Sequence, residues 1–294
     1  MAFDSATVNV QYPAGERVAH STGGMTVNRL VLCALVVLLS TVGLASAQEK
    51  VSLCGTGDSQ ELLRSLGSAF EKANPGVSIV VPDSVGSDGG IKAASAGECD
   101  FGRVARPLKD QEKELNLNYK VFSFSPIVFV VDPATGVENL SSQQVVDIFS
   151  GKVVAWADVG GKGGKIAVVN REAKDSSRGE LNKNVEGFKA IENPVGATAV
   201  KTPEAVELLS KTTNAVGYLP AAMAKGLKLK VVKVNGVAPT AANVAQGTYK
   251  IASPFGLVWK GELKPAANRF FQFIRSAEGK KIVIDYGTVP ADLL

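Results

Sequence analysis

The order of apolar segments along this chain constrains its fold more than any other feature. Short apolar runs of strand length alternate with stretches whose apolar residues recur at helical spacing, and Gly, Ser and Thr fill the turns between them. The first unit joins the run 51–54 through the turn 55–59 to a helix that carries Leu62, Leu66 and Phe70 on one face. This alternation predicts an α/β fold with largely parallel sheets.

The same pattern predicts the remaining elements and two lobes. Two long apolar segments, 122–131 and 251–259, have the length expected of strands that cross between lobes. We therefore expect one lobe to comprise 48–126 with 252–294 and the other to comprise 127–251. Further strands are expected at 77–81, 100–104, 166–169 and 215–218, and further helices at 91–96, from 202 onward and at 265–275.

The N-terminal 47 residues have the pattern of a signal peptide with an upstream extension. Asn28 and Arg29 precede the apolar run 30–39, and the small-residue stretch 45–47 follows it. The run is shorter than the about 20 residues that a comfortable membrane span needs. We expect cleavage after Ala47 and export to the periplasm, with Met1 or Met25 as the true start; an uncleaved signal anchor is the alternative.

Composition excludes several classes of function. The chain has 294 residues and a formal net charge of +4, and no run of Lys and Arg is visible, so a nucleic-acid partner is not expected. Its single histidine, His20, lies in the predicted signal region. Histidine-based acid–base catalysis, Ser–His triads and histidine metal sites are therefore excluded from the exported protein. We expect no enzymatic activity, no cofactor and no metal.

Two cysteines remain after removal of the signal region, which contains Cys33. Cys54 and Cys99 each lie beside a predicted strand of the first lobe, and an exported protein meets an oxidising environment. A disulfide between them is possible, but two buried thiols are an equal alternative because the sequence does not give the distance between their Cα atoms.

Three strand–turn–helix junctions could bind an anion. Backbone N–H groups at a helix start favour negative charge, and Ser59 and Ser87 add hydroxyl donors at the first two junctions. At the third, Arg171 ends a strand and Ser176 and Ser177 begin a helix. Each junction alone is also typical of ordinary turns and caps, and Asp58 or Ser59 is expected to cap its helix.

Several motifs together resemble the phosphate-binding proteins of ABC phosphate transporters. The resemblance extends in order over nearly all of 50–294. It rests on Gly55-Thr56-Gly57-Asp58-Ser59 and the stretches 84–90, 96–102, 106–108, 148–152, 156–161, 170–171, 215–218 and 286–290.

The resemblance implies a type II periplasmic binding protein whose two lobes are hinged by two crossing strands. It implies a monomer that holds dehydrated phosphate between its lobes and delivers it to an inner-membrane ABC permease. Carried over by motif, the ligand-binding residues are Ser59, Gln60 through its amide, Ser87, Asp100, Arg171, Asp175, Ser176 and Ser177.

Asp100 has a specific role in this hypothesis. A carboxylate repels an anion unless the anion carries a proton to donate, as hydrogen phosphate does and sulfate does not, so Asp100 is expected to filter the ligand. Asp88 and Asp175 depart from the family pattern. We expect them to point away, to pair with Lys174 or Arg178, or to signal another ligand.

Three other functions stay open on the sequence alone. A different oxyanion or a phosphonate could bind the same scaffold. A secreted phosphatase would need catalytic groups that the sequence does not show, since it has no G-x-S-x-G motif. A signalling or adhesion role would use the scaffold without transport.

Overall fold

A computed structural model describes residues 9, 11 and 48–294 of the chain. Residues 48–294 form one compact unit. The predicted signal peptide, with His20 and Cys33, lies outside the described residues. Among the residues that are described, no helix has the length and apolar character needed to cross a membrane.

A ten-stranded mixed sheet organises the unit. Its main path runs in the order β2-β1-β3-β11-β4-β8-β6-β7, and β9 and β12 pair with β4 beside it. The strands are β1 (Glu49–Gly55), β2 (Val77–Val80), β3 (Phe101–Val104), β4 (Leu117–Val131), β6 (Ala167–Arg171), β7 (Ala197–Ala199), β8 (Ala215–Pro220), β9 (Lys230–Val231), β11 (Ala252–Lys260) and β12 (Val289–Pro290). A separate parallel pair joins β5 (Asn139–Leu140) to β10 (Lys233–Val234).

The α/β class predicted from the sequence is confirmed, but the sheet is less parallel than expected. The pairs β1–β2, β1–β3, β6–β7 and β6–β8 are parallel. Strand β11 pairs antiparallel with β3 and with β4, and β4 pairs antiparallel with β8. The difference arises because the two long apolar segments run back through the middle of the sheet between its parallel edges.

Strand β4 changes partners along its length. Its first part, up to Pro126, pairs with β11, and its last five residues, from Ile127 onward, pair with β8. At the change the Ile127 N–H donates to the Ile251 carbonyl at 2.8 Å. The chain therefore passes between the β11 part and the β8 part of the sheet at Ile127 on one segment and next to Ile251 on the other.

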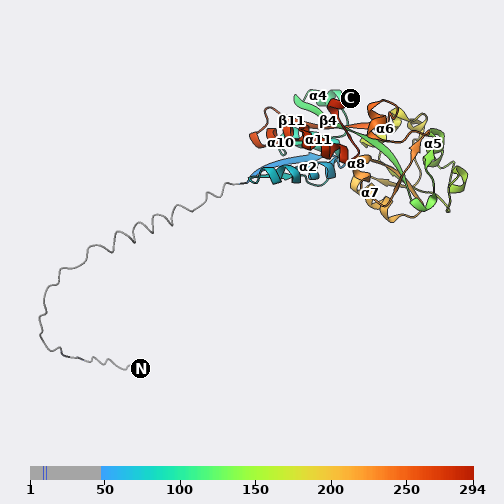
Figure 1. Cartoon of the computed structure of the whole chain (residues 1–294), viewed down its shortest axis with the longest axis horizontal. Coiled ribbons are helices and arrows are strands. Elements are labelled where there is room, and N and C mark those ends of the chain that lie inside the picture. The colour runs from blue at the N-terminus through green and yellow to red at the C-terminus, as the bar shows by residue number, and fades with distance from the viewer. Residues whose placement is uncertain (1–8, 10, 12–47) are drawn as a thin grey trace, which may run out of the picture. The chain divides into compact units, whose positions relative to one another are not determined.

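Two large apolar cores lie on either side of the point where β4 changes partners. One gathers Leu53, Leu62, Phe101 and Phe270 with their neighbours, and these four side chains are fully buried. The other gathers side chains from 127–251 and Val289, including the aromatic cluster of Phe129, Phe149, Phe188 and Tyr218. Figure 1 shows α2 and α10 on one side of the unit and α5 and α7 on the other.

Most predicted helices are found, with longer bounds in places. The helix expected at 91–96 begins earlier, at Gly86, and ends before Gly97, whose φ of +73° suits glycine. The helix at 265–275 has the predicted bounds. The helices are α2 (Gln60–Ala73), α3 (Gly86–Ala96), α4 (Asp110–Lys113), α5 (Ser142–Phe149), α6 (Ser176–Asn184), α7 (Thr202–Lys211), α8 (Ala221–Ala224), α9 (Ala241–Ala245), α10 (Pro265–Arg275) and α11 (Ala277–Asp285).

Candidate functional site

Four strand–helix junctions meet at one cavity of about 120 Å³. Its lining comes from the β1–α2 loop, the start of α3, the β6–α6 loop and the start of α7, through residues 56–57, 84–88, 171–172, 174–176 and 200–202. Sites for drug-sized ligands occupy roughly 300–1,000 Å³. The cavity therefore suits an ion or a very small molecule.

Residues from 48–126 and residues from 127–251 touch at this cavity. The Ser87 and Ser176 hydroxyl oxygens lie 3.2 Å apart, and the Thr202 hydroxyl donates to the Asp58 carboxylate. Gly57 approaches Pro203 so closely that a Cβ atom at Gly57 would lie 2.7 Å from the proline Cδ. Glycine is required at this position because any side chain would separate the two loops.

Arg171 is the central cation of the site. It ends β6 and is only 2% exposed. Its Nη2 atom donates to the Thr202 hydroxyl at 3.0 Å and lies 2.5 Å from Asp175 Oδ2. Its Nε and Nη1 atoms are buried and have no hydrogen-bond partner among the described residues. A buried guanidinium with unused donors is suited to binding an anion.

Three further buried polar groups near Arg171 lack partners within the described part of the chain. They are the hydroxyls of Ser59 and Ser177 and the side-chain amide nitrogen of Asn170. Ser177 is the second residue of α6, and Asn170 precedes Arg171 on β6. Buried polar groups in folded proteins are nearly always hydrogen-bonded, so a group of unused donors calls for an explanation. Arg171 lines the cavity, whereas Ser59, Asn170 and Ser177 are not among its lining residues, although Asn170 and Ser177 adjoin residues that are.

Asp58 and Asp175 place two carboxyl groups beside the one guanidinium. Burial raises the pKa of Asp58, while Arg171, Thr202 and Ser177 oppose the rise. The Ser177 hydroxyl lowers the pKa of Asp58 although the two side chains do not form a hydrogen bond. Burial also raises the pKa of Asp175, to about 6, against the attraction of Arg171 and with repulsion from Asp58. Both shifts arise because a charged carboxylate is poorly solvated there.

Asp175 is committed to structure on both of its oxygens. It is the N-cap of α6, where Oδ1 accepts from the Arg178 N–H at 2.9 Å, and Oδ2 pairs with Arg171. The expected pairing with Lys174 or with the Arg178 side chain is therefore replaced by the Arg171 pair and the helix cap. The Arg178 guanidinium donates instead to the carbonyls of Arg171 and Ile191.

The first junction differs from its predicted form. Ser59 is the N-cap residue of α2, but neither it nor Asp58 caps the helix through its side chain. Asp58 is drawn across to Thr202 instead. The Gln60 N–H donates to the Gly57 carbonyl at 3.2 Å, and the Gln60 side-chain oxygen accepts from Arg103 at 3.3 Å. Gln60 thus shapes the loop, and its amide is already used there.

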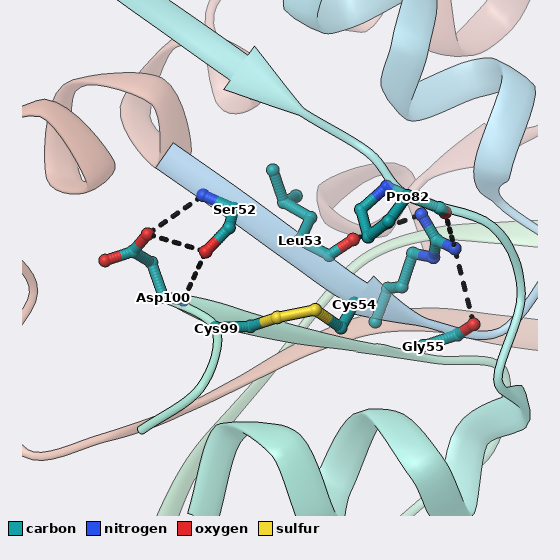
Figure 2. Close-up of a disulfide and its surroundings, with 8 residues drawn as sticks. Ser52, Leu53, Cys54, Gly55, Pro82, Cys99 and Asp100 are labelled. Carbon is teal, nitrogen blue, oxygen red and sulfur yellow. Dashed lines mark hydrogen bonds between the residues drawn. A yellow bond between two sulfur atoms is a disulfide. The ribbon is translucent and has the colours of Figure 1, made fainter. Parts of the chain in front are cut away.

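Asp100 is not brought to the cavity. It precedes β3, whereas the cavity lies beyond the opposite ends of β1 and β3. Its carboxylate accepts from the N–H and the hydroxyl of Ser52, both at 2.9 Å, and pairs with Lys264 at 2.8 Å, as Figure 2 shows for Ser52. The structure therefore gives no support to Asp100 as a ligand filter, and the carboxyl groups beside Arg171 are those of Asp58 and Asp175.

Ser87, Asp88 and Ser176 all line the cavity. The Ser87 hydroxyl accepts from the Ala105 N–H at 3.1 Å. Asp88 is paired with Arg106 and, at 3.2 Å, with Lys109 rather than with Lys174 or Arg178. Those two cations lower its pKa although its partial burial opposes them. Asp88 thus belongs to a surface ion-pair group.

Arg103 is a support of the site that the sequence did not reveal. Its side chain is fully buried and donates to the carbonyls of Thr56 at 2.8 Å, Leu53 at 3.1 Å, Gly55 at 3.3 Å and Pro82 at 2.7 Å. Burial lowers the pKa of Arg103 to about 10. Because Arg103 binds the carbonyls of the β1–α2 loop, it fixes the path of the chain into Gly57 and Asp58.

A disulfide joins Cys54 to Cys99, with their Cα atoms 6.1 Å apart. Figure 2 shows that it lies between β1 and the turn that carries Asp100. Of the alternatives that the sequence left open, the structure adopts the bonded one. The bridge anchors β1 at its penultimate residue, just before the loop that leads to the cavity.

Comparison with known proteins identifies the family. Residues 40–278 match the family model of the PBP superfamily domain. The chain belongs to the PBP superfamily. An ABC transporter substrate-binding protein of Clostridium perfringens, whose X-ray structure contains bound phosphate, is 31% identical with a TM-score of 0.75. The alignment covers 83% of this chain and 100% of that one.

Curated relatives within this PBP group carry a consistent name. The phosphate-binding protein PstS of Bacillus subtilis (strain 168) is 29% identical over 258 residues, which cover 85% of this chain and 84% of that protein. The phosphate-binding protein PstS of Borreliella burgdorferi is 24% identical over 268 residues, covering 86% and 96%.

Proposed function

We propose that this PBP superfamily protein captures inorganic phosphate in the cavity between residues 48–126 and residues 127–251 and delivers it to an ABC transporter. The group of unused buried donors on Arg171, Ser59, Ser177 and Asn170 carries the proposal. These donors can replace the water that a tetrahedral oxyanion loses on entry. The names of the relatives support phosphate as that anion.

The mechanism follows from how the cavity is built. Residues 48–126 with 252–294 contribute Ser59 and Ser87, and residues 127–251 contribute Arg171 and Ser177. We infer that these two parts act as lobes that close on the ligand and hinge where β4 and β11 pass between them. A monomer suffices for this action, because both halves of the site come from one chain.

The remaining parts of the proposal concern place and partner. An inner-membrane permease is the expected receiver of the ligand, and the predicted signal peptide would export the protein to the periplasm. We propose binding without catalysis, because the relatives are named as binding proteins and a solved relative is named as a substrate-binding protein.

Calorimetry of the purified protein tests the proposed ligand. Phosphate, arsenate, sulfate, molybdate and methylphosphonate are titrated separately at pH 7. We expect saturable binding of phosphate and arsenate and little heat from sulfate. Binding of molybdate or methylphosphonate without phosphate would instead support the alternative of another oxyanion or a phosphonate, which the second buried carboxyl group favours.

A further inference from the structure

The cavity combines a polar buried lining with apolar side chains at its exposed mouth. The buried side chains of the lining are polar, and none of them is more than 7% exposed: Thr56, Ser84, Ser87, Arg171 and Thr202. The apolar side chains of the lining are those of Val85 and Val200, which are 54% and 55% exposed. A guest whose oxygens reach the inner donors would therefore meet methyl groups at its outer end.

The two valines come from different parts of the chain. Val85 is the N-cap residue of α3, within 48–126, and Val200 lies two residues before α7, within 127–251. Gly57 brings the two segments together, because a Cβ atom at Gly57 would lie 3.2 Å from Ser84 Cβ and 2.7 Å from Pro203 Cδ. Each proposed lobe therefore contributes one valine to the mouth of the cavity.

Backbone hydrogen bonds hold both valines in place. The Val85 N–H donates to the Gly55 carbonyl at 3.0 Å, and the Val200 N–H donates to the Glu204 carboxylate at 2.8 Å. Single exposed apolar side chains are common on protein surfaces and need no special explanation. Two that are fixed at one small cavity, one from each proposed lobe, are a different case, because a guest in the cavity would lie against both.

The other exposed residues of the lining are charged: Asp88, Lys174 and Lys201. Asp88 is paired with Arg106 and Lys109. The two lysines attract an anionic guest to the mouth, while their long side chains keep the charged ends in water. The valines are thus the groups of the mouth that would lose contact with water when a carbon substituent lies between them.

We propose that the site binds, besides inorganic phosphate, phosphoryl anions that carry one short alkyl substituent, such as alkylphosphonates and alkyl phosphate monoesters. This inference rests on the proposed phosphate site and specifies its class of ligand. Three oxygens of the tetrahedral group face the inner donors, and the fourth position points to the mouth. A carbon chain at that position lies between Val85 and Val200, whereas the fourth oxygen of inorganic phosphate stays in contact with water there.

The test is a calorimetric titration of inorganic phosphate, methylphosphonate and ethylphosphonate into the purified protein at pH 7. The two phosphonates share one head group, so the ratio of their affinities reports the substituent alone. We expect both to bind, and ethylphosphonate to bind about fourfold more tightly, as for one buried methylene group. Equal or weaker binding of ethylphosphonate, or binding of phosphate with neither phosphonate, would overturn the inference while leaving phosphate binding intact. Absence of binding by all three would contradict the proposed function as well.

A double variant, Val85→Thr with Val200→Thr, tests the two side chains directly. Each substitution keeps the β-branched shape and replaces one methyl group by a hydroxyl group. We expect the affinity ratio of ethylphosphonate to methylphosphonate to fall from about fourfold to about one. Val154→Thr, at a position that is 51% exposed and lines another cavity, should keep the wild-type ratio. An unchanged ratio in the folded double variant would contradict the contact between valines and substituent. If the double variant does not fold, the same ratio in the two single variants decides, and each should be lower than in wild type.

Discussion

Thr202 donates its hydroxyl hydrogen to Asp58, a residue 144 positions earlier in the chain. The same hydroxyl accepts from Arg171 Nη2 at 3.0 Å. Thr202 thus links the Arg171 guanidinium to the Asp58 carboxyl group, and so joins the two proposed lobes. Both donors of this small network, Arg171 Nη2 and the Thr202 hydroxyl, belong to 127–251, and the final acceptor, Asp58, belongs to 48–126.

Loss of the Thr202 hydroxyl should loosen the closed arrangement. Thr202→Val keeps the side-chain volume but removes a hydrogen bond to a carboxyl group, which is worth about 1.5–3 kcal/mol when that group is charged. We expect phosphate affinity to fall about tenfold or more in calorimetry. Thr213→Val, at an exposed position, is the matched control. Equal affinities for the two variants would show that the link does not support closure.

Removal of the Arg171 side chain should abolish tight anion binding and weaken the fold. Arg171→Ala leaves Asp175 buried without its partner, and such a loss typically costs about 3–5 kcal/mol. We expect a lower denaturation midpoint and at least a hundredfold weaker phosphate binding, while Arg269→Ala, at a surface ion pair, changes neither.

Arg171→Lys distinguishes the two effects, since it keeps the charge but loses the planar set of donors. This variant should recover part of the stability and little of the affinity. Wild-type affinity in Arg171→Lys would contradict the assigned role of the guanidinium.

Asp100 should matter for stability and not for ligand choice. The bonds to Ser52 and Lys264 lower its pKa in the folded state, although partial burial opposes them. A lowered pKa stabilises the fold above about pH 4, the usual carboxyl range, and that contribution is lost as the pH falls through the folded-state pKa. Asp100→Asn should lower the free energy of unfolding by about 1–3 kcal/mol at pH 7.

Denaturant unfolding at pH 7 and pH 3 checks this expectation, because the difference between Asp100→Asn and wild type should shrink at the lower pH. The ratio of phosphate to sulfate affinity should not move. A large loss of discrimination in Asp100→Asn would restore the filter role that the motif implied.

Loss of the disulfide should destabilise the protein more than it weakens binding. The bridge closes a loop with a sequence separation of 45 residues. Cys54→Ala with Cys99→Ala should therefore cost about 2–4 kcal/mol of unfolding free energy. Arg103 still holds the β1–α2 loop through its carbonyls, so phosphate affinity should change less than threefold. A larger loss of affinity would make the bridge part of the binding machinery.

Local patterns were sufficient to predict the longer elements and the three junctions, but not short elements such as α4, α8 and α9. The amphipathic helix at 265–275, the turn at Gly97 and the strand that ends at Arg171 each depend on neighbours in sequence, so spacing alone located them. Ser87, Arg171 and Ser176 were brought together because the ends of parallel strands meet at one edge of a sheet.

Long-range contacts limited the prediction of the site itself. Asp58 appeared as a helix cap because its partner Thr202 belongs to a distant helix. Asp100 was placed at the site by motif, but strand β3 separates it from the cavity. Arg103 gave no signal because a buried guanidinium bonded to carbonyls looks, in sequence, like any strand residue.

The position of the bound anion tests the account most directly. Crystals of the purified protein grown with arsenate give an anomalous difference peak that locates the arsenic atom. We predict one strong peak between Asp58 and Arg171, with oxygens within hydrogen-bond distance of Ser59, Ser177 and both unused guanidinium nitrogens. A peak elsewhere on the protein, with that position holding only water at saturating arsenate, would contradict the account.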